Sequence, residues 1–259
     1  MKKDVALVLS SGSSRGLAHI GAIEALEAHG YTITSVAGCS MGAIVAGMYA
    51  AGKLSELKTW FVEMTRRRML ELTDFSLGKS YLVKGEKIMD ALGELIPDKL
   101  IENLPVSLAL VATDMITGNE VVFRSGNLNR AIRASFSLPV VLQPVHEGDM
   151  LLMDGGITNP LPVNRVARHE GDILVSSNVS AKWLEAQTSQ LSSLTILDKV
   201  SDVMIQQNCE LMKQLCPPDI SIDVAMNQFG SFDYDRADEI IRFGFDKMAA
   251  AIEAFEQGS

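Results

Sequence analysis

The chain has 259 residues, 47% of them hydrophobic, which is enough to bury one large core, so we expect a single domain over residues 1–259. Its 23 basic residues against 32 acidic ones give a net charge of −9, which argues against nucleic acid as the main partner. The three cysteines form no paired framework, and no apolar run reaches the roughly 18 residues of a membrane-spanning helix, so we expect a cytoplasmic protein.

The first part of the chain alternates short apolar runs with helical patterns. Residues 4–10 form a nearly continuous apolar strand, residues 11–16 a Gly/Ser loop, and residues 17–29 have helical spacing. A second strand over 31–37 leads through a sharp turn into a helix that ends near 51–52. Two buried strands joined by a helix favour a parallel sheet with right-handed crossovers.

The middle of the chain continues with helices and strands. An amphipathic helix is predicted over 54–75, and its Arg66, Arg67 and Arg68 favour a solvated helix face over a lid or a contact with an anionic membrane. The other expected elements are strands at 106–113, 120–124, 150–153 and 172–179, and helices at 128–135 and 161–169.

The core motifs lie within about residues 4–180, and a helix–strand–helix unit over 190–256 is expected to pack on the same core. Its parts are a long helix, a strand over 220–224 and a last helix over 238–255. One apolar face of the long helix is expected to pack on the sheet. That face consists of Leu194, Leu197, Val200, Met204, Leu211 and Leu215.

Ser40 is the candidate nucleophile. It lies between Gly38 and Gly42 in a G-x-S-x-G pattern, at the turn from a strand into a helix. Such a turn exposes the hydroxyl above the carboxyl edge of a sheet, close to a helix N-terminus. A tight turn without chemistry accounts for the pattern alone equally well. A reactive serine also needs a base and donors for the oxyanion.

The four histidines are weak candidates for the base. His29 and His146 lie in turns, where surface roles are expected, and His19 is expected to be packed in the first helix. Ser40, Asp154 and His169 follow the chain order of an α/β-hydrolase triad. His169, however, precedes the strand over 172–179 and therefore lies at the amino edge of a parallel sheet, a strand length from Ser40.

Asp154 is then the remaining base. It ends the strand over 150–153, and Gly155 and Gly156 let the backbone turn sharply and let another segment approach. Because Ser40 and Asp154 both follow strands, we expect both at the carboxyl edge. A Gly-Gly turn capped by an aspartate is the alternative without chemistry.

The loop after the first strand is the candidate oxyanion hole. Backbone amides of Gly12, Ser13, Ser14 and Arg15 can face a developing oxyanion, and Arg15 adds positive charge. The same loop fits a phosphate. Its glycines, Gly12 and Gly16, do not fill the dinucleotide fingerprint, and the loop lacks the ending of a nucleotide P-loop.

Together these motifs resemble those of the patatin-like phospholipase family, particularly its small bacterial members, over nearly the whole chain. Four segments in order carry the resemblance: residues 10–21 (Ser-Ser-Gly-Ser-Ser-Arg-Gly-Leu-Ala-His-Ile-Gly), 38–42 (Gly-Cys-Ser-Met-Gly), 134–139 (Ala-Ser-Phe-Ser-Leu-Pro) and 154–163 (Asp-Gly-Gly-Ile-Thr-Asn-Pro-Leu-Pro-Val).

The resemblance implies a three-layer α/β/α fold with a mostly parallel central sheet. It also implies a serine hydrolase that cleaves carboxylic esters of lipids without a metal, a cofactor or a catalytic histidine. Ser40 would be acylated, Asp154 would take its proton and later activate water, and residues 12–15 would hold the oxyanion. The expected partner is a lipid or a small acyl ester, with transient contact at a membrane surface.

The chain departs from the family at two positions of the loop. Where the family usually has three glycines, this chain has Ser11, Gly12 and Ser13. If positions 11 and 13 require a positive φ, serine strains the loop by about 1–2 kcal/mol and displaces the donors. A noncatalytic lipid-binding or regulatory protein with an impaired oxyanion loop is therefore the main alternative, and an acyltransferase that uses the same acyl-serine is the third.

Overall fold

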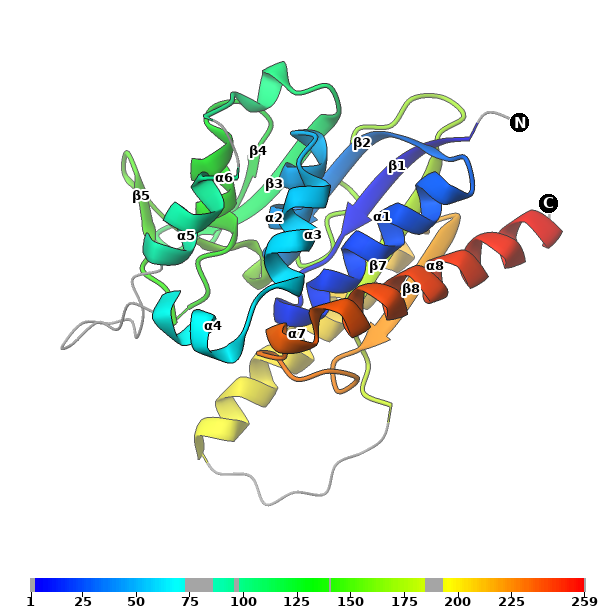
Figure 1. Cartoon of the computed structure of the whole chain (residues 1–259). Helices are drawn as coiled ribbons and strands as arrows, with labels where there is room; N and C mark the ends of the chain where they lie inside the picture. The colour runs from blue at the N-terminus through cyan, green and yellow to red at the C-terminus, as the bar shows by residue number, and fades with distance from the viewer. Residues whose placement is uncertain (1–2, 73–85, 96–97, 140, 185–192, 259) are drawn as a thin grey trace.

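The computed structural model describes residues 3–72, 86–95, 98–139, 141–184 and 193–258 (Figure 1). The strands are β1 (Asp4–Leu9), β2 (Thr32–Cys39), β3 (Ser107–Asp114), β4 (Glu120–Phe123), β5 (Val145–Glu147), β6 (Met150–Asp154), β7 (Ile173–Ala181) and β8 (Ile220–Ala225). The α-helices are α1 (Ala18–Ala28), α2 (Met41–Ala50), α3 (Leu54–Val62), α4 (Arg66–Leu72), α5 (Glu86–Gly93), α6 (Leu128–Ser135), α7 (Ser193–Leu215) and α8 (Ala237–Gly258). Short 3₁₀ turns lie at Ser13–Leu17, Ile101–Asn103, Gly155–Ile157 and Tyr234–Arg236.

The strands form one mixed, eight-stranded sheet in the order β5-β6-β3-β2-β1-β7-β8, and β4 also pairs with β3. Strands β8, β7, β1, β2 and β3 run parallel to one another. Strands β4 and β6 run antiparallel to β3, and β5 runs antiparallel to β6. Because parallel strands end at one edge, the loops that follow β1, β2, β7 and β8 meet at the carboxyl edge of the sheet.

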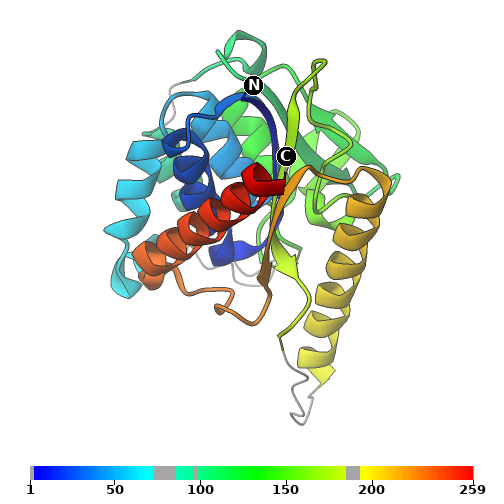
Figure 2. The ribbon, with the colours of Figure 1, turned by 90° about the vertical axis from the view of Figure 1, so that its right-hand side faces the viewer.

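Helices cover both faces of the sheet and make three layers (Figure 2). Alternate residues of β1 show this: Val5 and Leu7 belong to the apolar core under α1, α2 and α8, whereas Ala6 and Val8 belong to a second core under α7. All four side chains are fully buried, which is typical of a strand covered on both faces. The expected three-layer α/β fold is therefore confirmed.

Two expected helices differ in the structure. Residues 161–169 form turns and not a helix. Pro160 and Pro162 explain this, because proline lacks an amide donor and keeps the preceding residue out of the helical conformation. The helix expected over 54–75 is two helices, α3 and α4, and residues 73–75 lie outside the described part of the chain. The side chain of Arg67 is 90% exposed and pairs with Glu71, in agreement with a solvated face.

The long helix α7 packs on the sheet with a different face from the one that we expected. Cys209 is fully buried in the core, where Ile205, Met212 and Cys216 pack around it. Four residues of the expected face are instead exposed: Val200, Met204, Leu211 and Leu215. The side chains of Leu194 and Leu197 lie outside the described part. Because two faces of α7 carry apolar residues, the spacing of apolar residues in the sequence did not show which face is buried.

The C-terminal elements share the core of the rest of the chain. Strand β8 pairs with β7, and α8 packs along α1 (Figure 1). A single domain over residues 1–259 stays a prediction. Among the described residues, none of the helices combines the length and the apolar composition that crossing a bilayer requires.

Candidate active site

Ser40 lies at the sharp turn between β2 and α2, as the sequence predicted. Its φ of 56° and ψ of −123° are unusual for a residue with a side chain, so the backbone is strained at this point. Neighbouring glycines make the turn possible. A Cβ at Gly42 would lie 2.4 Å from the carbonyl oxygen of Leu9, and one at Gly38 would lie 2.3 Å from the carbonyl oxygen of Gly42.

Ser40 and Asp154 are in direct contact. The Ser40 hydroxyl donates a hydrogen bond of 2.6 Å to Oδ2 of Asp154, and both side chains are buried. The other carboxylate oxygen, Oδ1, accepts a hydrogen bond of 2.8 Å from the amide of Gly156. Gly155 lies so close to Val111 that a Cβ would be 2.2 Å from its carbonyl oxygen. One carboxylate oxygen is thus held by the backbone and the other faces the serine.

Asp154 reaches Ser40 along a strand whose direction we did not predict. In the structure β6 runs antiparallel to β3, so Asp154 pairs with Ala112, one residue beyond the Val111 that pairs with Cys39. Strand β3 extends past the end of β2, and β6 returns along this extension toward Ser40. The expected proximity is found, but the assumption that Asp154 ends a parallel strand is wrong.

Burial controls the acidity of the site. It raises the pKa of Asp154 from the ordinary value of 3.8 to about 6, because the buried carboxylate loses its hydration. Hydrogen bonds from Ser40 and Gly156 oppose this rise, since they stabilise the ionised form. The Cys39 thiol lies 4.0 Å from Oδ1 of Asp154, and burial followed by the nearby carboxylate raises its pKa, so it stays neutral. Asp154 is therefore ionised at neutral pH yet more basic than an exposed aspartate.

His19 is buried and holds the start of the loop after β1. Its Nε2 bonds to the carbonyl oxygen of Ser10 at 2.9 Å, and its Nδ1 bonds to the hydroxyl of Ser177 at 2.8 Å. A carbonyl oxygen only accepts, so Nε2 carries the hydrogen and Nδ1 accepts from Ser177. Burial lowers the pKa of His19 to about 4, which keeps the ring neutral. The expectation of a packed, hydrogen-bonded histidine is confirmed.

Two of the other histidines lie where the sequence placed them, His169 at the amino edge and His29 in a turn, whereas His146 lies in strand β5 and not in the expected turn. His169 is exposed before β7 at the amino edge of the sheet, and its Nδ1 lies 3.3 Å from Asp172. His29 bonds to a carbonyl oxygen at the end of α1, and His146 is exposed on β5. In the described part of the chain, which includes all four histidines, no imidazole bonds to the Ser40 hydroxyl or to the Asp154 carboxylate.

The loop after β1 is anchored at both ends. The Ser11 amide donates a hydrogen bond of 2.8 Å to the carbonyl oxygen of Pro160, and the Ser14 amide donates one of 3.4 Å to that of Ser231. Between these anchors, the amides of Gly12 and Ser13 have no acceptor among the described residues. These two amides are therefore the candidate donors to an oxyanion.

Arg15 belongs to this loop, but its side chain does not take the place beside the oxyanion that we expected. The guanidinium is buried and donates to the carbonyl oxygens of Val179 and Met226, each at 3.1 Å, and of Phe229 at 3.4 Å. It thus ties the loop to β7 itself and to the segment that follows β8. We therefore assign loop positioning to this side chain, in place of the positive charge that we expected it to add beside the oxyanion.

One of the two serines that replace family glycines has a strained backbone. Ser13 has a φ of 51°, in the left-handed region, whereas Ser11 is not among the residues with positive φ. Only the substitution at position 13 therefore carries the strain considered from the sequence.

Replacing Ser13 with glycine is expected to raise the free energy of unfolding by about 1 kcal/mol relative to Ser13→Ala, because glycine adopts a positive φ without a Cβ clash. Ser13→Ala is the matched control, since it removes the hydroxyl but keeps the Cβ. Urea unfolding of both variants measures the difference. Equal stability of the two variants would rule out the strain.

Ser135 is a site residue whose role the sequence did not reveal. Its hydroxyl accepts a hydrogen bond of 3.0 Å from the amide of Ser40 and donates one of 2.6 Å to the carbonyl oxygen of Val111. Two residues later, the carbonyl oxygen of Ser137 accepts a hydrogen bond of 2.9 Å from the amide of Asp154. This short segment at the end of α6 thus holds the backbone of both Ser40 and Asp154.

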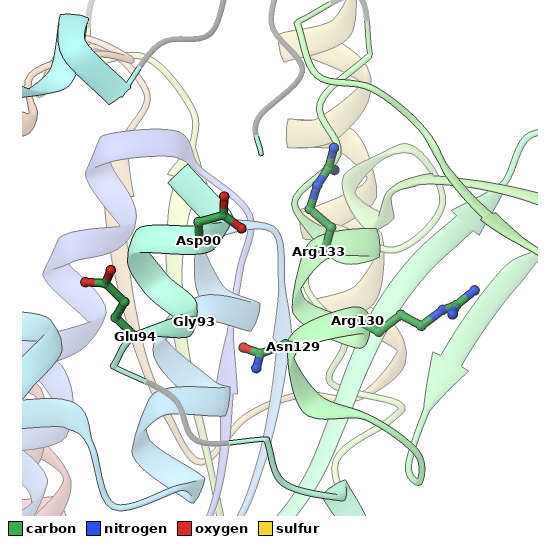
Figure 3. A pocket seen from close by; sticks show the side chains of 6 residues that line it. All are labelled: Asp90, Gly93, Glu94, Asn129, Arg130 and Arg133. Carbon is green, nitrogen blue, oxygen red and sulfur yellow. The ribbon is translucent and has the colours of Figure 1, made fainter. Parts of the chain in front are cut away.

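A separate depression of about 630 Å³ opens between α5 and α6 (Figure 3). It is lined by Asp90, Gly93, Glu94, Asn129, Arg130 and Arg133. Figure 3 shows Arg130 pointing away from the two acidic residues. Arg130 bonds to the carbonyl oxygen of His146 at 2.9 Å and Arg133 to that of Gln143 at 2.8 Å. Since the protein itself engages both cations, we assign this depression no part in the site.

Comparison with known proteins identifies the family. The profile of the patatin-like phospholipase family matches residues 7–167, which include the loop after β1, Ser40 and Asp154. The chain belongs to the patatin-like phospholipase family. An uncharacterized NTE family protein from Mycobacterium bovis is 40% identical over 205 residues, which cover 73% of this chain and 57% of that protein. Patatin-like phospholipase domain-containing protein 6 from Mus musculus is 33% identical over 175 residues, which cover 64% of this chain and 13% of that protein.

Solved structures share the patatin-like fold. The ExoU–SpcU complex from Pseudomonas aeruginosa matches with a TM-score of 0.55 and 18% identity, over 99% of this chain and 52% of that chain. VipD from Legionella pneumophila matches with a TM-score of 0.52 and 13% identity, over 98% of this chain and 67% of that chain. At these identities the likeness concerns the fold. The chain spans 57% of the mycobacterial relative, so the activity of the whole relative is not transferred to it.

Proposed function

We propose that this patatin-like protein is a lipid acyl hydrolase whose reaction uses Ser40 and Asp154 alone as nucleophile and base. The hydrogen bond of 2.6 Å between the Ser40 hydroxyl and the Asp154 carboxylate carries the proposal. It joins a strained serine elbow to a buried, basic carboxylate, and these are the nucleophile and the base of acyl transfer to a serine. The family supports lipid esters as the substrate class.

The reaction proceeds in two steps. Asp154 accepts the proton of the Ser40 hydroxyl as Oγ attacks the ester carbonyl, and the amides of Gly12 and Ser13 stabilise the oxyanion. The proton then passes from Asp154 to the leaving alcohol, which leaves an acyl ester on Ser40. In the second step Asp154 takes a proton from water as the water oxygen attacks the acyl ester. The bond between the acyl carbon and Oγ of Ser40 then breaks, Oγ takes the proton from Asp154, and the fatty acid leaves.

The alternative function is noncatalytic lipid binding with an impaired oxyanion loop. The positive φ of Ser13 is the observation in its favour. The contact between Ser40 and Asp154 favours the enzyme, because a binding protein has no need of a buried carboxylate beside a strained serine. We also retain the prediction of a cytoplasmic location, since the three cysteines are free.

The pH dependence of ester hydrolysis tests the base. Because burial raises the pKa of Asp154 to about 6, the base is ionised above that pH and protonated below it. We expect kcat/KM for a short nitrophenyl ester to be level near pH 8 and to fall about tenfold per unit below about pH 6.

A fluorophosphonate probe separates the enzyme from the binding protein. The wild type is expected to be labelled at Ser40 at neutral pH, and labelling should decline over the same pH range as hydrolysis. Far-UV circular dichroism at each pH checks that the protein remains folded. A folded wild-type protein that takes no label would favour the noncatalytic alternative, and a profile centred near pH 4 would contradict the buried base.

A further inference from the structure

Large exposed apolar side chains gather at the edge of the sheet that carries Ser40. Leu184 follows β7 and is 69% exposed, and Phe232 follows β8 and is 72% exposed. Strands β7 and β8 run parallel to β1, and β1 to β2, so both loops lie at the same edge as the turn that holds Ser40. Ile196, also exposed, lies in the first turn of α7, which begins at this edge (Figure 2). We call Leu184, Ile196 and Phe232 the apolar rim.

The segments that carry the apolar rim contact one another. The amide of Leu184 donates a hydrogen bond of 3.0 Å to the side-chain oxygen of Asn227, in the loop that leads to Phe232. The Nζ of Lys199 lies 4.6 Å from the centre of the Trp183 ring, so the first turns of α7 contact the segment that contains Leu184. The three apolar side chains therefore lie on segments that hold one another in place.

The apolar rim is also joined to the candidate oxyanion loop. The hydroxyl of Ser14 donates a hydrogen bond of 2.6 Å to the carbonyl oxygen of Gly230, and the amide of Ser14 donates to Ser231, the residue before Phe232. The guanidinium of Arg15 bonds to Met226 and Phe229 in the same loop. A surface that binds through Phe232 is thus fixed to the loop beside Ser40.

The chemistry of the apolar rim fits the interface of a lipid layer. Residues 182–184 are Lys-Trp-Leu, a cation, an aromatic ring and an aliphatic chain in succession. Tryptophan favours the level of the lipid headgroups, and lysine side chains reach past it toward water and phosphate. Asp233, the acidic residue beside Phe232, is already paired with Arg236 and with the amide of Gly230. Lys182 is exposed and Lys199 lies over Trp183, so two cations lie beside Trp183 on a chain with a net charge of −9.

We propose that the apolar rim inserts into the surface of a phospholipid layer and so presents the carboxyl edge of the sheet to the acyl esters of that layer. The inference rests on the proposed function, because a lipid-bound substrate is what makes contact at this edge useful. Ser40 and Asp154 are buried, and a lipid enters their site directly if the edge lies against the layer from which the lipid comes. Exposed apolar loops beside a site, with cations and an aromatic ring around them, are typical of proteins that bind at membrane surfaces.

Vesicle binding tests the proposal in a Ser40→Ala background, where no lipid is consumed. Sedimentation with phosphatidylcholine vesicles is expected to capture this protein, and Leu184→Ser with Phe232→Ser is expected to weaken the binding by roughly tenfold or more. Leu215→Ser is the matched control, since Leu215 is 70% exposed but lies at the other end of α7, at the amino edge. This control is expected to bind as the parent does.

Tryptophan fluorescence gives a second measurement. The chain has two tryptophans, Trp60 and Trp183, of which Trp60 is buried in the core. Phosphatidylcholine vesicles are expected to shift the emission to shorter wavelength in Trp60→Phe and to leave it unchanged in Trp183→Phe. A shift that persists in Trp183→Phe would overturn the proposed orientation.

The outcomes distinguish this proposal from the proposed function. If vesicles bind through the apolar rim but the wild type hydrolyses no ester, membrane binding by the rim is supported and the proposed hydrolase activity is refuted. If a soluble nitrophenyl ester is hydrolysed but vesicles bind the double variant and the parent equally, the proposed hydrolase activity is supported and membrane binding by the rim is refuted. A wild-type dimer that the double variant dissociates, with no vesicle binding by either, would assign the rim to a second copy of the chain and overturn the proposal.

Discussion

Asp154→Asn is expected to lower kcat/KM for ester hydrolysis by about 10⁴-fold, as is Ser40→Ala, because acylation loses its base or its nucleophile. The amide of asparagine has nearly the shape of the carboxylate, and its oxygen can still accept from Gly156, but it cannot take the Ser40 proton. If Ser40 and Asp154 act as one unit, as we propose, the double variant should be little worse than either single one. Nitrophenyl ester turnover and fluorophosphonate labelling measure both effects.

Asp114→Asn is the matched control for the aspartate. Asp114 is also buried, but it accepts hydrogen bonds from Thr117 and Ile116 in the turn after β3 and from Leu151 of β6, and not from Ser40. This variant is expected to keep the kcat of the wild type even if it melts at a lower temperature.

Asp154→Asn should melt at or above the wild-type temperature near pH 8, because the folded state then holds no desolvated charge. A folded Asp154→Asn variant with wild-type turnover would refute the assignment of the base.

The sign of that stability change follows from the raised pKa. Burial makes the folded-state pKa of Asp154, about 6, higher than the ordinary 3.8, so ionising this group costs folding free energy. The cost is fully present above about pH 6 and disappears as the pH falls from there toward about 4. The advantage of Asp154→Asn in melting temperature is therefore expected to shrink over the same range.

Gly12→Ala is expected to lower kcat by about 10²–10³-fold, the usual effect of losing one oxyanion donor. A Cβ at this position would lie 2.4 Å from Cγ2 of Val179 and 3.1 Å from its carbonyl oxygen. Val179 is fully buried in β7, so the loop must move and carry the amides of Gly12 and Ser13 with it. Substrate binding depends on other contacts, so KM should change much less than kcat.

A second substitution tests that the collision causes the loss. Val179→Ala removes the methyl group that the new Cβ would meet, so the double variant Gly12→Ala with Val179→Ala should recover part of the lost kcat. Gly93→Ala is the control for glycine substitution as such, since a Cβ at Gly93 would meet no atom within 4 Å. It is expected to have wild-type kinetics. Wild-type kcat in Gly12→Ala would show that this loop does not supply the oxyanion donors.

Local patterns predicted most of the geometry of the candidate site. The glycines around Ser40, the strand before it and the helix after it indicate a serine elbow, and the structure has that turn with a φ of 56° at Ser40. The order of elements around His169 was sufficient to place it at the amino edge. Such inferences succeed because each depends on neighbours in the chain or on the shared direction of parallel strands.

Contacts between distant segments account for what local patterns missed. The Ser135 hydroxyl donates a hydrogen bond to Val111, 24 residues away in the sequence, and accepts one from Ser40, 95 residues away. No local spacing in the sequence therefore reveals that Ser135 holds the backbone of Ser40. The direction of β6 was unexpected because the apolar pattern of a five-residue strand does not show whether the strand runs parallel or antiparallel to its neighbour. The guanidinium of Arg15 faces carbonyl oxygens more than 160 residues away, which a loop pattern cannot indicate.

By itself, the amino-acid sequence determined the family, the order of the elements, the serine at a turn and the aspartate at the end of a strand. Those features follow from backbone preferences and apolar periodicity, which act over a few residues. The tertiary structure alone decided that β6 runs back along β3 to set Asp154 against Ser40, that α7 buries the face around Cys209, and that Leu184 and Phe232 share one exposed edge. The physical reason is that strand pairing and core packing are decided by the surfaces that meet, and these surfaces come from segments far apart in the chain.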